Sequence, residues 1–99
     1  MENDEFGGFA PPPYKPEEAV LLLQRALRGL HLKERGDAFE LAGKPVLVHH
    51  VQDGAVHIML ARRPALAPEW DKRVLRSAAD QRKLLDDVKS RLTRWDREE

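Results

Sequence analysis

The side chains best suited to chemistry in this 99-residue chain are its histidines, His31, His49, His50 and His57. Asp53-Gly54, a pair typical of a tight β-hairpin turn, places residue 49 or residue 50 opposite His57 on the neighbouring strand. Two opposed imidazoles, with Glu40 beside them, could ligate zinc, or could sense pH because two imidazolium ions repel. We favour a third interpretation, ordinary half-exposed strand residues, because predictive zinc motifs repeat their ligands at fixed short spacings. We therefore expect no metal ion and no cofactor.

Motifs for catalysis are missing from the sequence. It has no cysteine, no G-x-S-x-G nucleophile motif, no glycine-rich phosphate loop and no H-E-x-x-H zinc motif. The adjacent Asp86 and Asp87 fall on a mixed-charge helix face, where carboxylates are usually solvated. A domain this small also has little room for a substrate pocket of ordinary size. We therefore expect a protein that is not an enzyme.

A second group of candidate residues is basic and runs from the last residue of the last predicted strand to just before the last predicted helix. Phosphate contacts from such a patch would give salt-sensitive binding to nucleic acid. Because the net charge of the chain is zero, any electrostatic partner must be reached through a local patch of this kind. The alternative is a solvated connection, in which Glu69 and Asp71 offset part of the charge. The candidate nucleic-acid-binding residues are Arg62, Arg63, Lys72, Arg73 and Arg76.

Residues 1–15 have the composition of a disordered, acidic and proline-rich tail. Within it, Pro11-Pro12-Pro13-Tyr14 matches the PPxY pattern that WW domains bind as polyproline II, although a plain spacer would have the same composition. Residues 16–96 are predicted to form a single domain, and residues 97–99 to fray. The chain has 41% hydrophobic residues but no signal peptide and no apolar run of membrane length, so we expect a soluble, cytoplasmic protein.

The spacing of apolar residues predicts an α+β fold with two layers. Pro16 suits the first turn of a helix, and Ser77 with Asp80 resembles the capping box of another. Alternating apolar residues between these helices predict a three-stranded antiparallel meander. Residues 65–76 are predicted as a connection with one short helical turn. The predicted elements are a helix over 16–30, strands over 38–42, 46–52 and 55–62, and a helix over 78–95.

The register of the central hairpin decides which side chains share a face, because a slip of one residue exchanges the faces. A two-residue turn at Asp53-Gly54 would place His50 opposite His57. A three-residue loop with a glycine bulge would instead place His49 opposite His57. We prefer the bulged loop because it gathers the cleaner apolar set on one face, namely Phe39, Leu41, Val46, Val48, Val56, Ile58 and Leu60.

The order helix, three strands, helix resembles the topology of double-stranded-RNA-binding domains, and Ser77 stands where that family begins its second helix. That family grips phosphates with lysines in the first turn of this helix, where the present chain has Ala78, Ala79 and Asp80. The resemblance is therefore one of topology, which implies a fold and does not by itself imply a function. Nucleic-acid binding through the basic residues is the alternative function.

The main functional prediction comes from apolar side chains left on the second face of the sheet. Contiguous exposed apolar area usually marks an interface. We therefore predict a non-catalytic protein-interaction module that binds a partner protein or a second copy of itself, homodimerisation being the simplest version. The predicted protein-binding residues are Leu47, His49, Val51, His57 and Met59.

Overall fold

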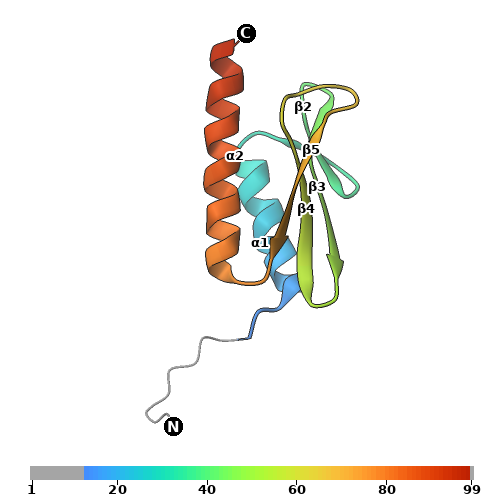
Figure 1. Ribbon diagram of the computed structural model, residues 1–99, viewed down its shortest axis with the longest axis vertical. Coiled ribbons are helices and arrows are strands. Elements are labelled where there is room, and N and C mark those ends of the chain that lie inside the picture. The colour runs from blue at the N-terminus through green and yellow to red at the C-terminus, as the bar shows by residue number, and fades with distance from the viewer. Residues whose placement is uncertain (1–12, 99) are drawn as a thin grey trace.

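The computed structural model describes residues 13–98 and has one helix before and one helix after a five-stranded sheet. The elements are α1 (Pro16–Gly29), β1 (Lys33–Arg35), β2 (Ala38–Leu41), β3 (Lys44–Gln52), β4 (Ala55–Ala61), β5 (Trp70–Leu75) and α2 (Ala78–Glu98). The strands form an antiparallel meander in the order β1-β2-β3-β4-β5. Both helices lie on the same side of the sheet, which gives two layers (Figure 1). The predicted α+β class is confirmed, with five strands in place of three.

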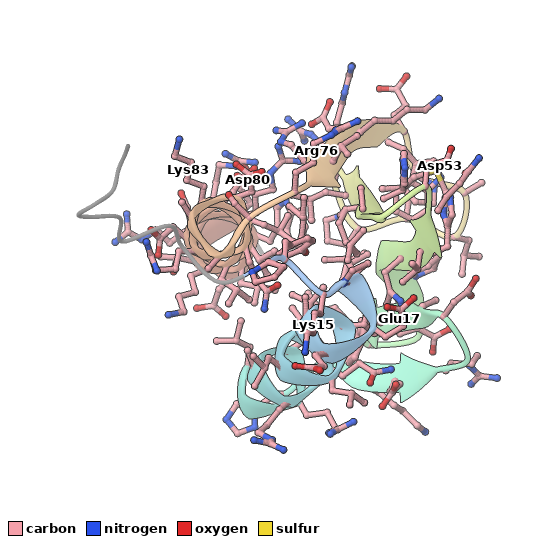
Figure 2. The ribbon with its side chains drawn as sticks, turned by 90° about the horizontal axis from the view of Figure 1, so that it is seen from below. Lys15, Glu17, Asp53, Arg76, Asp80 and Lys83 are labelled. Carbon is pink, nitrogen blue, oxygen red and sulfur yellow. The ribbon has the colours of Figure 1, made fainter. Side chains whose placement is uncertain are left out.

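Both helices begin at the residues that the sequence predicted. Pro16 occupies the first position of α1, and Glu17 follows in the first turn, where a carboxylate suits the helix dipole. At the start of α2 the Asp80 amide donates to the Ser77 hydroxyl (3.1 Å), while the Asp80 carboxylate accepts from the amide of Arg76 (2.9 Å). These reciprocal bonds satisfy amides that the helix leaves free. Figure 2 looks at the end of the molecule where both helices begin.

Two of the five strands lie in segments that the sequence predicted as connections. In β1, the Glu34 carboxylate points toward α1 and accepts hydrogen bonds from Gln24 (2.8 Å) and Arg28 (2.7 Å). In β5, Asp71 and Arg73 point toward α2, where they pair with charged side chains. Because polar residues occupy the helix-facing positions, neither segment has the apolar alternation of an ordinary half-buried strand. Residues 65–69 are a connection as predicted, but no helical turn forms there, and residues 70–75 are a strand that the prediction missed for this reason.

The hairpin of β3 and β4 has the register that the sequence did not favour. Asp53 and Gly54 form a two-residue turn, and His50 lies opposite His57. Both turn residues have positive φ, 53° at Asp53 and 73° at Gly54, which a type I′ turn requires. The preferred three-residue loop, with His49 opposite His57, was therefore wrong. All assignments of β3 side chains to a face change with it.

The core lies between the helices and the inner face of the sheet, the face turned toward them. The pairing of β2 with β3 shifts between Phe39 and Glu40, so Val46 is an extra residue on β3, a β-bulge. Val46 and Leu47 are both buried, whereas Val48, predicted in the core, is only half-buried on the opposite face. The largest fully buried side chains are Leu23, Leu27, Phe39, Val46, Leu47, Val56, Ile58 and Leu60.

Candidate functional site

The face of the sheet turned away from the helices, here called the outer face, is not covered by any element within residues 13–98 (Figure 1). Neighbouring side chains along a strand point to opposite faces, so the observed pairing fixes its members. They come from all five strands. The outer-face residues are Lys33, Arg35, Ala38, Glu40, Pro45, Val48, His50, Gln52, Ala55, His57, Met59, Ala61, Trp70, Lys72 and Val74.

Apolar and aromatic side chains occupy the centre of the outer face. Val48 lies opposite Met59 on the neighbouring strand, and His57 lies opposite Val74 on the next. Trp70 extends the group toward the start of β5. Val74 is 39% exposed, and the other four are half-buried. Apolar side chains that lie side by side on a sheet face and remain partly exposed are a candidate interface.

The two histidines of the outer face stack on each other. The rings of His50 and His57 lie 5.1 Å apart between centroids and are within 13° of parallel. The Nε2 atom of His50 is also 3.2 Å from the side-chain oxygen of Gln52. Nitrogen lone pairs lie in the ring plane, so parallel stacked rings do not direct them at one shared ion. No group of three or more potential ligands gathers anywhere in residues 13–98.

The charge of the outer face is positive. Lys33, Arg35 and Lys72 point outward from the two edge strands, and Glu40 is the acid among the outer-face residues. Glu40 is already paired with Arg35 at 3.2 Å. With neutral histidines the face therefore carries three positive charges and one negative charge. A partner with negative charge would be attracted to it.

The predicted protein-binding residues lie on both faces of the sheet. His57 and Met59 belong to the outer face, whereas Leu47 is buried in the core and His49 is 8% exposed on the inner face. Val51 also points to the inner side, near the hairpin turn, and is partly exposed there. The structure therefore brings two of the five together. Val48, Trp70 and Val74, which the sequence prediction left out, complete the apolar centre because the true register places them beside Met59 and His57.

His49 is an unusual core residue. Its ring lies 6.1 Å from that of Phe39, and its Nε2 atom has no hydrogen-bond partner within the described part of the chain. Burial lowers the pKa of His49, since the charged imidazolium would lose its hydration, although the nearby carboxylates of Asp37 and Glu34 oppose this effect. His49 is therefore a neutral packing residue rather than part of a binding surface.

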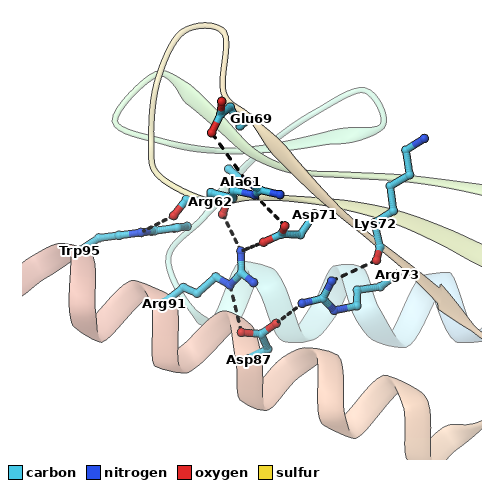
Figure 3. A network of polar contacts seen from close by, with 9 residues as sticks. All are labelled: Ala61, Arg62, Glu69, Asp71, Lys72, Arg73, Asp87, Arg91 and Trp95. Atoms are coloured by element: carbon cyan, nitrogen blue, oxygen red, sulfur yellow. Dashed lines mark hydrogen bonds and ion pairs between the residues drawn. The ribbon is translucent and has the colours of Figure 1, made fainter.

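The basic residues proposed for nucleic-acid binding do not form one patch. Arg62 pairs with Asp71 at 2.8 Å, and Arg73 pairs with Asp87 of α2 at 3.3 Å (Figure 3). Arg63 and Arg76 are exposed beyond opposite ends of β5, and Lys72 belongs to the outer face. Arg73 thus links the sheet to α2, Arg62 pairs with a residue of β5, and the other three lie at separate places.

Arg91 is the centre of the charged network drawn in Figure 3. Its guanidinium contacts the carboxylates of Asp71 (2.9 Å) and Asp87 (3.0 Å) and donates to the backbone carbonyl of Ala61 (3.0 Å). The residue is 8% exposed, and Asp71 also accepts from Arg62. Hydrogen bonds from these two arginines hold the pKa of Asp71 below its usual value. Every charge in the network has a partner, so we assign it a structural role.

The PPxY pattern lies partly outside the described residues, which begin at Pro13. Tyr14, the residue that a WW domain would need exposed, is half-buried and packs against the core. Neither helix within residues 13–98 is long and apolar enough to cross a bilayer. Comparison of the chain with protein-family models, curated proteins and solved structures gave no match.

Proposed function

We propose that this protein is a non-catalytic interaction module that binds an acidic, partly apolar surface of another protein through its outer face. The observation that carries the proposal is the open sheet face itself, with Val48, Met59, Trp70 and Val74 at its centre. Burial of such side chains on binding would contribute the affinity. The cations at the two edges, Lys72 among them, would select a partner of opposite charge.

The size of the outer face supports a reversible rather than a permanent complex. Four inter-strand spacings of about 4.8 Å and a strand of seven residues give a face of roughly 20 by 23 Å. Obligate dimers bury far more surface than such a face offers. We therefore expect a weak complex that forms and dissociates, with affinity set by the central apolar side chains.

The charges of the outer face argue against a second copy of the chain as the partner. Two sheets packed face to face about an axis parallel to their strands would place β5 over β1, so Lys72 would meet Lys33 and Arg35. An axis across the strands would place β5 over β5, and Lys72 would meet its own equivalent. Like charges oppose each other in both arrangements. A different, acidic protein avoids this repulsion.

Nucleic acid is the second candidate partner, because the rings of His50, His57 and Trp70 share the outer face with cations. Aromatic rings and positive charge together can bind a single strand by stacking and phosphate contacts. The protein partner is favoured because only Lys72 of the five predicted basic residues belongs to this face.

A charge-reversal pair tests the proposal. Lys72→Glu changes the outer face, and Lys89→Glu makes the same change at an exposed position of α2, in the other layer. Both variants and the unmodified protein would be used to capture proteins from an extract of the native organism. We expect an acidic protein that is captured by the unmodified protein and by Lys89→Glu, and that is lost with Lys72→Glu. Equal capture by all three would contradict the proposal.

Two further measurements separate the alternatives. Light scattering should show a monomer at micromolar concentration. If it shows a dimer whose stability Lys72→Glu changes, the partner of the outer face is a second copy of the chain and not an acidic protein. Titration with a single-stranded oligonucleotide at low salt should show no binding. Salt-sensitive binding that Lys72→Glu removes and Lys89→Glu keeps would assign the outer face to nucleic acid instead.

A further inference from the structure

His49 lies where the hairpin of β1 and β2 is attached to β3. Its backbone amide donates to the carbonyl of Asp37 (3.0 Å), which lies in the turn between β1 and β2. On the inner face its ring packs against the ring of Phe39 in β2, with the centroids 6.1 Å apart. One residue of β3 therefore meets the hairpin through both its backbone and its side chain.

The β1–β2 hairpin has the shortest strands of the sheet and lies at one of its edges. β1 has three residues and β2 has four, whereas β3 has nine and β4 has seven. The bulge at Val46 also interrupts the pairing of β2 with β3. Segments with little pairing open locally at a lower free energy than the whole domain. A change at His49 should therefore affect this hairpin before the rest of the sheet.

A proton added to the His49 ring would meet no acceptor in the core. The residue is 8% exposed, and its Nε2 atom has no hydrogen-bond partner within residues 13–98. An imidazolium ion has a hydrogen on both nitrogens, so protonation would make Nε2 a buried, charged donor without an acceptor. Leaving a buried donor unsatisfied is unfavourable, and more so when the group is charged. The penalty is removed if the ring moves into water.

Burial of the His49 ring outweighs the charges around it. Burial lowers the pKa of His49, the adjacent His50 acts in the same direction, and the carboxylates of Asp37 and Glu34 oppose them. Asp37 is exposed, so water and salt screen its charge. Protonation of His49 is therefore opposed as long as the hairpin is closed.

The remaining neighbours give the ring no charged partner. Glu34 extends from β1 toward α1, where its two carboxylate oxygens accept from Gln24 (2.8 Å) and Arg28 (2.7 Å). On β4 the residue opposite His49 is Ile58, a buried apolar side chain. The described part of the core thus holds the ring in its neutral form.

We propose that His49 is an acid-sensitive attachment: when it takes up a proton, its ring leaves the core and the β1–β2 hairpin separates from β3. The pairing of β3 with β4 and of β4 with β5 does not involve this ring and stays closed. The hairpin carries Lys33, Arg35 and Glu40 of the outer face, so acid would also weaken the complex with an acidic protein. That consequence rests on the proposed function, whereas the opening itself does not.

Hydrogen exchange of the full chain, measured amide by amide and corrected for the intrinsic effect of pH, tests the opening without any partner. Between about pH 7.5 and pH 5.5, the protected amides of residues 33–41 and of His49 should exchange up to about ten-fold faster. Ten-fold is the increase expected if only the open hairpin takes up a proton at the ordinary imidazole pKa of about 6.5. Amides of β4 and β5 should not change. Equal acceleration in all strands, or none in the hairpin, would overturn the proposal.

A matched pair of substitutions assigns the effect to one ring. His49→Gln keeps a polar side chain that does not titrate, and His50→Gln makes the same change at the next residue, which is exposed on the outer face. The pH dependence of the hairpin should disappear in His49→Gln and persist in His50→Gln. Its persistence in His49→Gln, or its loss in His50→Gln, would contradict the assignment. If His49→Gln does not fold, the strands that open in the unmodified protein and in His50→Gln still decide the question.

Discussion

Arg91→Met is the perturbation that the structure predicts most definitely. Methionine fills the volume of the buried arginine but cannot donate a hydrogen bond, so the buried Ala61 carbonyl loses its donor, at a cost of about 1–3 kcal/mol. Removing the cation from between two carboxylates adds to this cost. Because Asp71 keeps Arg62 and Asp87 keeps Arg73, the addition is smaller than for a fully buried pair. We expect a total loss of about 2–4 kcal/mol of unfolding free energy.

Urea denaturation followed by circular dichroism measures this loss, and Arg94→Met provides the control. Arg94 lies on the same helix and is exposed, so the same substitution there should change the unfolding free energy by less than about 0.5 kcal/mol. The difference between the two variants isolates the network from helix propensity. If Arg91→Met is as stable as Arg94→Met, the bonds of Arg91 are offset by its desolvation and the reasoning is wrong.

Three further predictions concern stability. Burial lowers the pKa of His49, so the folded protein should be most stable above the unfolded pKa of about 6.5 and should lose stability as pH drops below it. In the His49→Gln variant, the urea concentration at the unfolding midpoint should therefore change less between about pH 7.5 and pH 5 than in the unmodified protein. Hydrogen bonds lower the pKa of Asp71, so its contribution should be present above about pH 4 and disappear as pH falls further, and an Asp71→Asn variant that kept this acid dependence would contradict the assignment. Gly54→Ala should cost about 1–2 kcal/mol of unfolding free energy. The cost comes from the φ of +73° alone, because no atom crowds the new methyl group. Gly29→Ala in α1 should be neutral or stabilising, and equal urea midpoints for the two variants would exclude the type I′ turn.

The helices could be predicted from the sequence because their signals are local. Pro16 and the Ser77–Asp80 capping box mark where each begins, and the structure has both helix starts at the predicted residues. The predicted end of α2 at residue 95 was too early, since the helix continues through Glu98 beyond its last buried residue, Trp95. A helix end without a glycine or proline has no comparable signal.

The register could not be predicted because both faces of the hairpin are apolar. Val46, Leu47 and Val48 follow one another, and only the bulge at Val46 explains how the first two share the core. A histidine in the core, His49, further favoured the wrong face. The observed register follows from the two-residue turn, in which Asp53 and Gly54 both have positive φ. The apolar alternation that favoured the other register was the weaker signal.

The two missed strands, and the outer-face residues that lie on them, could not be predicted because their pairing is long-range. Asp71 and Arg73 look like surface residues in the sequence, but their partners on α2 lie at least fourteen positions away in the chain. Without β5, neither Trp70 nor Val74 could be placed beside Met59. The candidate site was therefore half predicted: the sheet face and two of its residues were inferred, and the edge residues required the tertiary fold.

The central claim is that the outer face contacts an acidic protein, and photo-cross-linking in the native cell tests it most directly. A photoreactive phenylalanine derivative would replace His50, an exposed outer-face residue, and in a matched variant Ser90, an exposed residue of α2. We predict that position 50 cross-links one acidic protein, that Lys72→Glu reduces the yield, and that position 90 gives no such product. Cross-linking from position 90 alone, or equally from both positions, would contradict the account.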